Sequence, residues 1–172
     1  MPVPLFAALR AVHVLSGALW VGAAVMSAAY IVPAVMASGP AGGQVMRVMA
    51  QVRRLPVFMN MIMLTTLVTG LALYGLDSGG FQWAWIASRT GIAFTLGALL
   101  AFVTAGIGQV VSVPSVKRLG ALGAAVAASG GPPTPEQAAE MGAIQRKLLG
   151  ATRVAAALVV LAVLVMATAR FA

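Results

Sequence analysis

The chain has 172 residues, of which 61% are hydrophobic and 8% are charged, and its net charge is +8. Soluble domains carry about 25% charged residues, so this composition excludes a water-soluble globular protein and makes lipid the expected solvent. The basic excess does not indicate a nucleic-acid partner, because Lys and Arg flank apolar stretches and form no dense run.

Four stretches are long and apolar enough to cross a membrane, which takes about 20 residues of helix. They are Leu5–Val35, Phe58–Leu76, Gly91–Val113 and Ala151–Phe171. Backbone polar groups must bond internally in lipid, so each stretch is expected to be helical. The sequence predicts an all-α fold: one transmembrane domain over residues 1–172, an integral membrane four-helix bundle with interfacial or cytoplasmic connecting helices.

The segments around these stretches carry signals of their own. The first apolar run exceeds the roughly 7–15 residues of a signal peptide, so we expect an uncleaved span. Ser38–Gly43 is a Gly- and Pro-rich breaker, and a short interfacial helix is expected between it and Pro56. Thr134 and Gln137 have the spacing of a capping box around Pro135, which predicts a helix from Pro135 into the fourth span.

Most of the 11 Lys and Arg residues fall in the first and third connections. The positive-inside rule then predicts a multi-pass protein of the cell inner membrane, with cytoplasmic long connections and both termini outside, in the periplasm. The residues on which this rests are Arg47, Arg53, Arg54, Lys117, Arg118, Arg146, Lys147 and Arg153.

His13 is the only histidine and is the first functional candidate, because ionisable groups within spans are costly. It shares a helical face with Arg10, Gly17 and Trp20. Two interpretations stay open: a neutral imidazole hydrogen-bonded to a neighbouring helix, or a ligand of heme or a metal. The spans contain no carboxylate and no Ser/His/Asp arrangement, so no catalytic residue is predicted and an enzyme is not favoured.

Helix depth suggests a partner for His13. His13 lies about 12 Å and Met166 about 8 Å from the outer ends of their spans, at the helical rise per residue. Methionine is a known axial partner of histidine on heme iron. Arg10 and Arg170, one turn further out, could hold the propionates. The sequence therefore predicts a heme b site made of His13, Met166, Arg10 and Arg170.

Copper is a second candidate cofactor. Met59 and Met63 share a helical face, and copper(I) accepts thioether ligands, so a copper set of His13, Met59 and Met63 is an alternative. Methionine also fills irregular cores without binding anything. Heme b, copper and no cofactor all stay open at this point.

Small residues at four-residue spacing predict close helix packing in lipid. The third span has such a ladder at Ala93, Gly97, Ala101 and Ala105, and the second span has a Thr66-Gly70 pair. A single-chain bundle, a homodimer and a larger membrane complex could each use these faces, with the lipid bilayer around them.

The stretch Leu9–Gly22, which contains His13 and Trp20, resembles the opening span of a group of small bacterial membrane proteins. The group comprises the copper-resistance D-like family, related uncharacterised integral membrane families and the HemJ-type protoporphyrinogen oxidases. The chain is most similar to the uncharacterised branch. The resemblance implies heme or copper handling, with His13 as the matching position. HemJ-type proteins carry a further histidine that this chain lacks, so oxidase activity is not expected.

Two functions follow from these observations. In the first, the protein binds one heme b, or copper, near the outer face through His13 and serves in redox or metal handling. In the second, it is a non-catalytic subunit or assembly factor whose spans pack against a larger membrane complex. An optical spectrum distinguishes the two.

Overall fold

The computed structural model of the chain describes residues 3–171, apart from the side chains of Pro40 and Arg170. This part of the chain is all-α and contains no strand. Four of its helical stretches are long and apolar enough to cross a membrane: Val3–Ala37, Leu55–Asp77, Arg89–Ser129 and Pro135–Thr168. The predicted fold class is confirmed, and the protein is an integral membrane protein.

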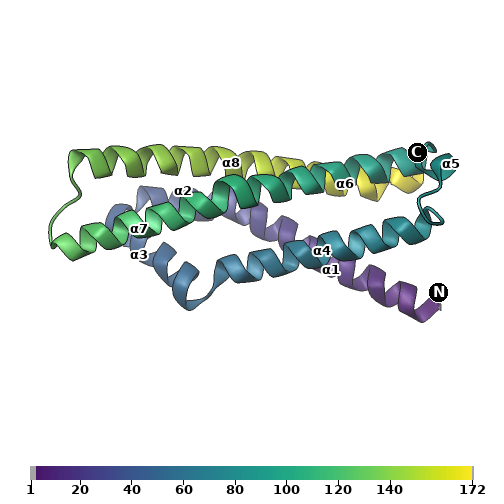
Figure 1. The fold of residues 1–172 in the computed structure, drawn as a ribbon, viewed down its shortest axis with the longest axis horizontal. Coiled ribbons are helices and arrows are strands. Elements are labelled where there is room, and N and C mark those ends of the chain that lie inside the picture. The colour runs from purple at the N-terminus through teal and green to yellow at the C-terminus, as the bar shows by residue number, and fades with distance from the viewer. Residues whose placement is uncertain (1–2, 172) are drawn as a thin grey trace.

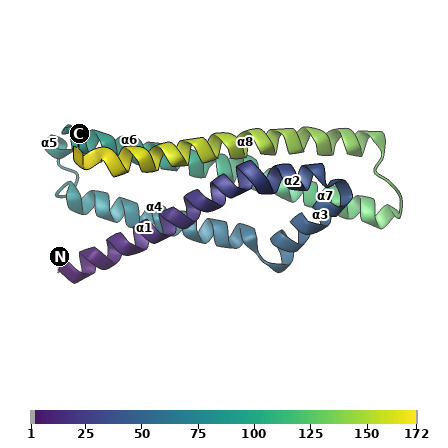
Figure 2. The ribbon, with the colours of Figure 1, turned by 180° about the vertical axis from the view of Figure 1, so that it is seen from behind.

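The four spanning helices form two pairs in an elongated bundle (Figure 1). Helix α1 (Val3–Met26) packs against α4 (Leu55–Asp77), and α6 (Arg89–Ile107) packs against α8 (Pro135–Thr168). The short helix α5 (Trp83–Ile86) and both ends of the chain lie at the same end of the bundle. Figure 2, from behind, shows α1 crossing α4 and meeting α8 only beyond this crossing.

The first span continues past a proline. After α1 the helix widens into a π-helical turn, Ser27–Ile31, and continues as α2 (Val32–Ala37). Pro33 lies just after the wide turn. Proline has no N–H, and its ring clashes with the carbonyl four residues earlier, so a wider turn lets the helix pass without a sharp break.

The third span uses the same device and is longer than its predicted apolar stretch. Helix α6 continues through a π-helical turn, Gly108–Ser112, into α7 (Val113–Ser129), and Pro114 again follows the turn. The 41 residues of Arg89–Ser129 are about 60 Å long, twice the thickness of the hydrocarbon core. Helix α7 and the first half of α8 therefore form a hairpin that extends beyond the bilayer.

A helix break is predicted at Ser38–Gly43, but most of this segment is helical. Helix α3 spans Gly39–Arg47 and continues into a π-helical turn, Val48–Val52. At the corner between α2 and α3, Gly42 lies against the backbone carbonyl of Val35, where a β-carbon would not fit. The glycines serve a close backbone approach here, so the predicted extent of the break is wrong.

The predicted start of the last helix, at Pro135, is confirmed. The Thr134 hydroxyl accepts a hydrogen bond from the Gln137 N–H at 3.3 Å, and the Gln137 side chain accepts one from the Thr134 N–H at 3.0 Å. Helix α8 then runs unbroken to Thr168 and ends in a 3₁₀ turn, Ala169–Phe171. The reciprocal cap satisfies backbone donors that the first helical turn leaves free.

Outside the bilayer, an ion pair joins the two arms of the hairpin. The Arg118 guanidinium of α7 donates two hydrogen bonds to the Glu140 carboxylate of α8, at 2.7 and 3.0 Å. Both side chains are exposed, so water and salt weaken the pair.

The buried core lies at the level where all four spanning helices meet. Its fully buried members are Trp20 of α1, Ile62 and Met63 of α4, Ala105 of α6 and Val159 of α8. One large indole among smaller side chains fills the centre, and most other apolar residues point outward toward lipid. The bundle is thin, with little more than one layer of shared core.

Candidate functional site around His13

The His13 side chain faces α4 and bonds to its backbone. Its Nδ1 atom lies 3.0 Å from the carbonyl oxygen of Thr66 and 3.2 Å from Oγ1 of Thr69. Gly70 lies directly against the ring, because a β-carbon there would be 2.7 Å from Cε1 of His13. The imidazole is therefore half-buried against a helix backbone that only glycine leaves open.

The partners of Nδ1 determine which ring nitrogen carries the proton. A carbonyl oxygen such as that of Thr66 can only accept, and the Thr69 hydroxyl donates its own proton to the Thr65 carbonyl at 2.6 Å. Nδ1 of His13 must therefore be the donor. In the neutral imidazole, Nε2 then carries a free lone pair, and no described residue hydrogen-bonds to it.

This arrangement has the chemistry of a metal-ligating histidine. Histidines that bind a metal through one nitrogen almost always donate the other ring N–H to a carbonyl, a carboxylate or water. The carbonyl of Thr66 supplies that partner to His13. The bond to α4 is the one expected from the first interpretation, a neutral imidazole hydrogen-bonded to a neighbouring helix, and it leaves a single nitrogen, Nε2, that could ligate a heme iron or another metal.

Hydroxyl groups continue the same contact one turn deeper. The Thr66 hydroxyl donates to Oγ of Ser16 at 3.0 Å across the interface and also lies 2.7 Å from the Ile62 carbonyl of its own helix. The Ser16 hydroxyl donates to the Val12 carbonyl at 2.8 Å. Every hydroxyl here has a partner, as hydrocarbon requires. We call His13, Ser16, Thr66, Thr69 and Gly70 the polar seam.

The remaining residues of the predicted heme site do not join the polar seam. Arg10 is exposed one turn outward from His13. Met166 lies in the α6–α8 interface, where a β-carbon at Gly97 would be 2.6 Å from its Cγ. Figures 1 and 2 both show the N-terminal half of α1 diverging from α8. The Arg170 side chain lies outside the described part of the chain.

The two methionines of the predicted copper set lie in the core. Met63 is buried in the cluster that contains Trp20, and Met59 packs against this cluster. Among the described residues, no group of three or more His, Asp or Glu side chains could hold a metal ion. Met59 and Met63 therefore have the surroundings of core-filling side chains, without His13 among them.

An aromatic cluster joins the two helix pairs at the end of the bundle where α5 lies (Figure 1), and this contact was not predicted from the sequence. The Tyr74 hydroxyl of α4 lies 2.6 Å from Oγ1 of Thr95 on α6. The Tyr74 ring meets Trp85 edge-on at 5.2 Å, and Trp85 stacks on Phe94 at 6.2 Å. Trp83 is exposed, as expected of an indole at the bilayer boundary. The signal in the sequence that could have indicated this contact is a pair of polar residues in consecutive spans, Tyr74 and Thr95.

No family model, no curated protein and no solved structure matches the chain. The resemblance of Leu9–Gly22 to copper-resistance D-like and HemJ-type proteins therefore stays a prediction, and function is argued from the geometry of the chain itself.

Proposed function

We propose that this membrane protein binds one heme b near the outer face through Nε2 of His13 and serves in redox or metal handling. The hydrogen bond between Nδ1 and the Thr66 carbonyl, at 3.0 Å, is the observation that carries the proposal. It fixes the ring and directs the free lone pair to Nε2. A bound heme would supply one-electron redox chemistry.

The chain would contribute orientation and charge to this site. Gly70 sets the depth of the imidazole against α4, and the Thr66 carbonyl fixes the orientation of the ring. Arg10, exposed one turn outward, is suited to a propionate. Met166 already fills the space at Gly97, so the proposal needs His13 alone as a protein ligand.

Copper is the weaker form of the proposal. Met63 is buried beside Trp20, and its sulfur lies 3.9 Å from the Gln109 amide nitrogen. A metal at this sulfur would have to open the core. His13 would then be the only accessible soft or borderline ligand of the predicted set.

The orientation of the protein belongs to the same proposal. The first and third connections, with most of the basic residues, lie at the end of the bundle opposite both termini (Figure 1). The positive-inside rule then puts the basic end in the cytoplasm and the His13 end toward the periplasm of a bacterial inner membrane.

An optical titration tests the heme proposal. The full chain, purified in detergent and supplied with hemin, should develop a shifted Soret band that saturates at one heme per chain. His13→Ala should lose the band, because no other histidine exists. Gly22→Ala is the matched control, because it lies on the same helix and a β-carbon there meets nothing within 4 Å. An equal band in wild type and His13→Ala would contradict the proposal.

A second candidate function, a subunit or homodimer within a membrane complex, rests on a different observation. Ala18 and Gly22 of α1 are both exposed at four-residue spacing, and a β-carbon at Gly22 would meet nothing within 4 Å. Small residues at this spacing mark helix contact faces in lipid. If they hold a partner, Gly22→Leu should reduce the mass of the complex in mild detergent. An unchanged mass would reject this second function, and if a heme spectrum is present only the heme proposal would then stand.

A further inference from the structure

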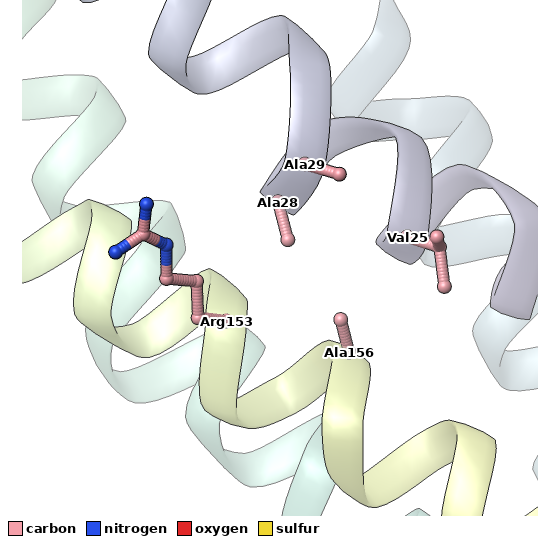
Figure 3. A pocket seen from close by; sticks show the side chains of 5 residues that line it. All are labelled: Val25, Ala28, Ala29, Arg153 and Ala156. Atoms are coloured by element: carbon pink, nitrogen blue, oxygen red, sulfur yellow. The ribbon is translucent and has the colours of Figure 1, made fainter.

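A pocket opens between the first and fourth spans, at the far side of the core from His13. It has a volume of about 290 Å³ and is lined by Val25, Ala28, Ala29, Arg153 and Ala156. Figure 3 shows Ala28 and Ala156 pointing toward each other from the two helices, with the Arg153 guanidinium at one end of the space between them. The lining is apolar except for this one cation.

The local helix geometry explains the space. Ala28 and Ala29 belong to the π-helical turn Ser27–Ile31, which Pro33 imposes on the first span. The small side chains on both helices then leave the space unfilled. Its volume is roughly ten times the share of liquid volume that one water occupies. It can accept a phosphate group together with its glycerol.

Arg153 has no counter-ion among the residues that the structure describes. The sequence contains three acidic residues, and Glu140 is bonded to Arg118. Glu136 lies about 25 Å before Arg153 along the α8 axis. Asp77 ends α4 at the opposite end of the bundle. Arg153 is exposed, and an anion that pairs with its guanidinium would have to come from outside the protein.

The depth of Arg153 indicates the source of that charge. It lies about 22 Å from the Thr168 end of α8, and the hydrocarbon core is about 30 Å thick. Its backbone is thus just inside the hydrocarbon at the basic end, and an arginine side chain can extend from there to the headgroups. A lipid phosphate lies at that level, and the apolar lining can contact the start of an acyl chain.

We propose that this pocket binds one anionic phospholipid of the leaflet at the basic end. The Arg153 guanidinium pairs with the phosphate, and Ala28, Ala29 and Ala156 receive the glycerol and the first acyl methylenes. Planar, bidentate donors suit phosphate oxygens, and basic pockets between spans are a recurring kind of headgroup site. The bound lipid would bridge the first span and α8 beside the contact that these helices already make.

Native mass spectrometry of the detergent-solubilised full chain tests this site. We expect one tightly retained phosphatidylglycerol and no comparable retention of phosphatidylcholine with the same acyl chains. Arg153→Gln should weaken phosphatidylglycerol binding about fivefold or more, the loss that one basic contact near a membrane surface represents. Arg146→Gln is the matched control, because Arg146 is exposed on the same face of α8, two turns away from the pocket.

A second variant keeps the test decisive if Arg153→Gln fails to fold. Ala29 is exposed on the pocket wall, so Ala29→Leu fills the space and leaves every charge in place. It should weaken phosphatidylglycerol binding as strongly as Arg153→Gln. Three results would overturn the proposal: wild-type retention in the variants, an equal loss in Arg146→Gln, or displacement of the lipid by millimolar inorganic phosphate.

Discussion

The two helix pairs of the bundle pack closely through different kinds of contact, one polar and one apolar. Between α1 and α4, a histidine ring lies on Gly70 and bonds to the helix backbone. Between α6 and α8, the Met166 side chain lies on Gly97, with the Ala162 carbonyl close by. In each pair one glycine admits one large side chain. The first contact is polar and directional, and the second is apolar.

The α6–α8 contact is explained by stability, whereas the α1–α4 contact also positions a candidate functional residue. Lipid gives helices no hydrophobic reason to associate, so both pairs depend on close packing. The α6–α8 contact supplies packing alone. The polar seam adds hydrogen bonds that are individually weak but fix the orientation of His13. A role for the imidazole therefore explains these polar residues within the spans better than stability does.

The largest effect is expected from filling the apolar contact. Gly97→Val would place atoms within 2.6–2.9 Å of Met166 and push α6 from α8, which we expect to lower the free energy of unfolding by about 2–3 kcal/mol. Reversible unfolding in mixed micelles, followed by circular dichroism, measures it. Gly106→Val is the control, because a β-carbon at Gly106 meets nothing within 4 Å. Equal losses of unfolding free energy in the two variants would contradict this, because the loss would then come from placing valine in α6 and not from the contact between Gly97 and Met166.

Filling the polar seam should have a smaller effect on stability and a larger one on the site. Gly70→Ala would put a methyl group 2.7 Å from Cε1 of His13, so the ring must move from the Thr66 carbonyl, at about 1–2 kcal/mol. Hemin binding should weaken together with stability. Gly22→Ala, in open space on α1, should change neither quantity. Hemin binding that survives Gly70→Ala unchanged would contradict the role of the seam.

Removing the imidazole should cost less stability again. His13→Ala deletes one interhelical hydrogen bond, for which we expect about 0.6–1.7 kcal/mol. His13→Asn separates the two roles of the residue, because its amide can still donate to the Thr66 carbonyl but is a poor iron ligand. It should therefore unfold closer to wild type than His13→Ala and still fail to bind hemin.

The smallest effect is expected for the hydroxyl pair of the seam. A double-mutant cycle of Ser16→Ala and Thr66→Val should give a coupling energy near 0.6 kcal/mol, typical of hydrogen bonds between spans. Both residues are buried and 3.0 Å apart through their oxygens. A coupling energy of zero would mean that each hydroxyl is satisfied by its own helix alone.

Features set by one helix at a time were predictable from the sequence, whereas features set by two helices were not. Apolar length gave the four spans, and the Thr134–Gln137 spacing gave the start of α8. The depth of His13 and Met166 follows from helical rise, but the rotation of each helix depends on packing, and this placed the two side chains in different interfaces.

Backbone adjustments were also beyond the sequence patterns. Pro33 and Pro114 are helix breakers by rule, yet a π-helical turn before each lets the helix continue. The pocket beside Arg153 follows from the first of these turns. The charge pattern assigned Arg153 to the basic end of the protein. Only the fold shows that it lies opposite Ala28 and Ala29.

The most direct test of the proposed role of His13 is to measure which ring nitrogen of the imidazole carries the proton. Nitrogen-15 NMR of the histidine-labelled, hemin-free protein in micelles reports both ring nitrogens of His13 without overlap, because the chain has one histidine. We predict a protonated Nδ1 and an unprotonated Nε2 at neutral pH, and a shift toward the ordinary mixture of the two tautomers in Gly70→Ala. A proton on Nε2 in the wild-type protein would contradict this prediction, since the hydrogen bond from Nδ1 to the Thr66 carbonyl would then be absent and a heme iron would have no ligand.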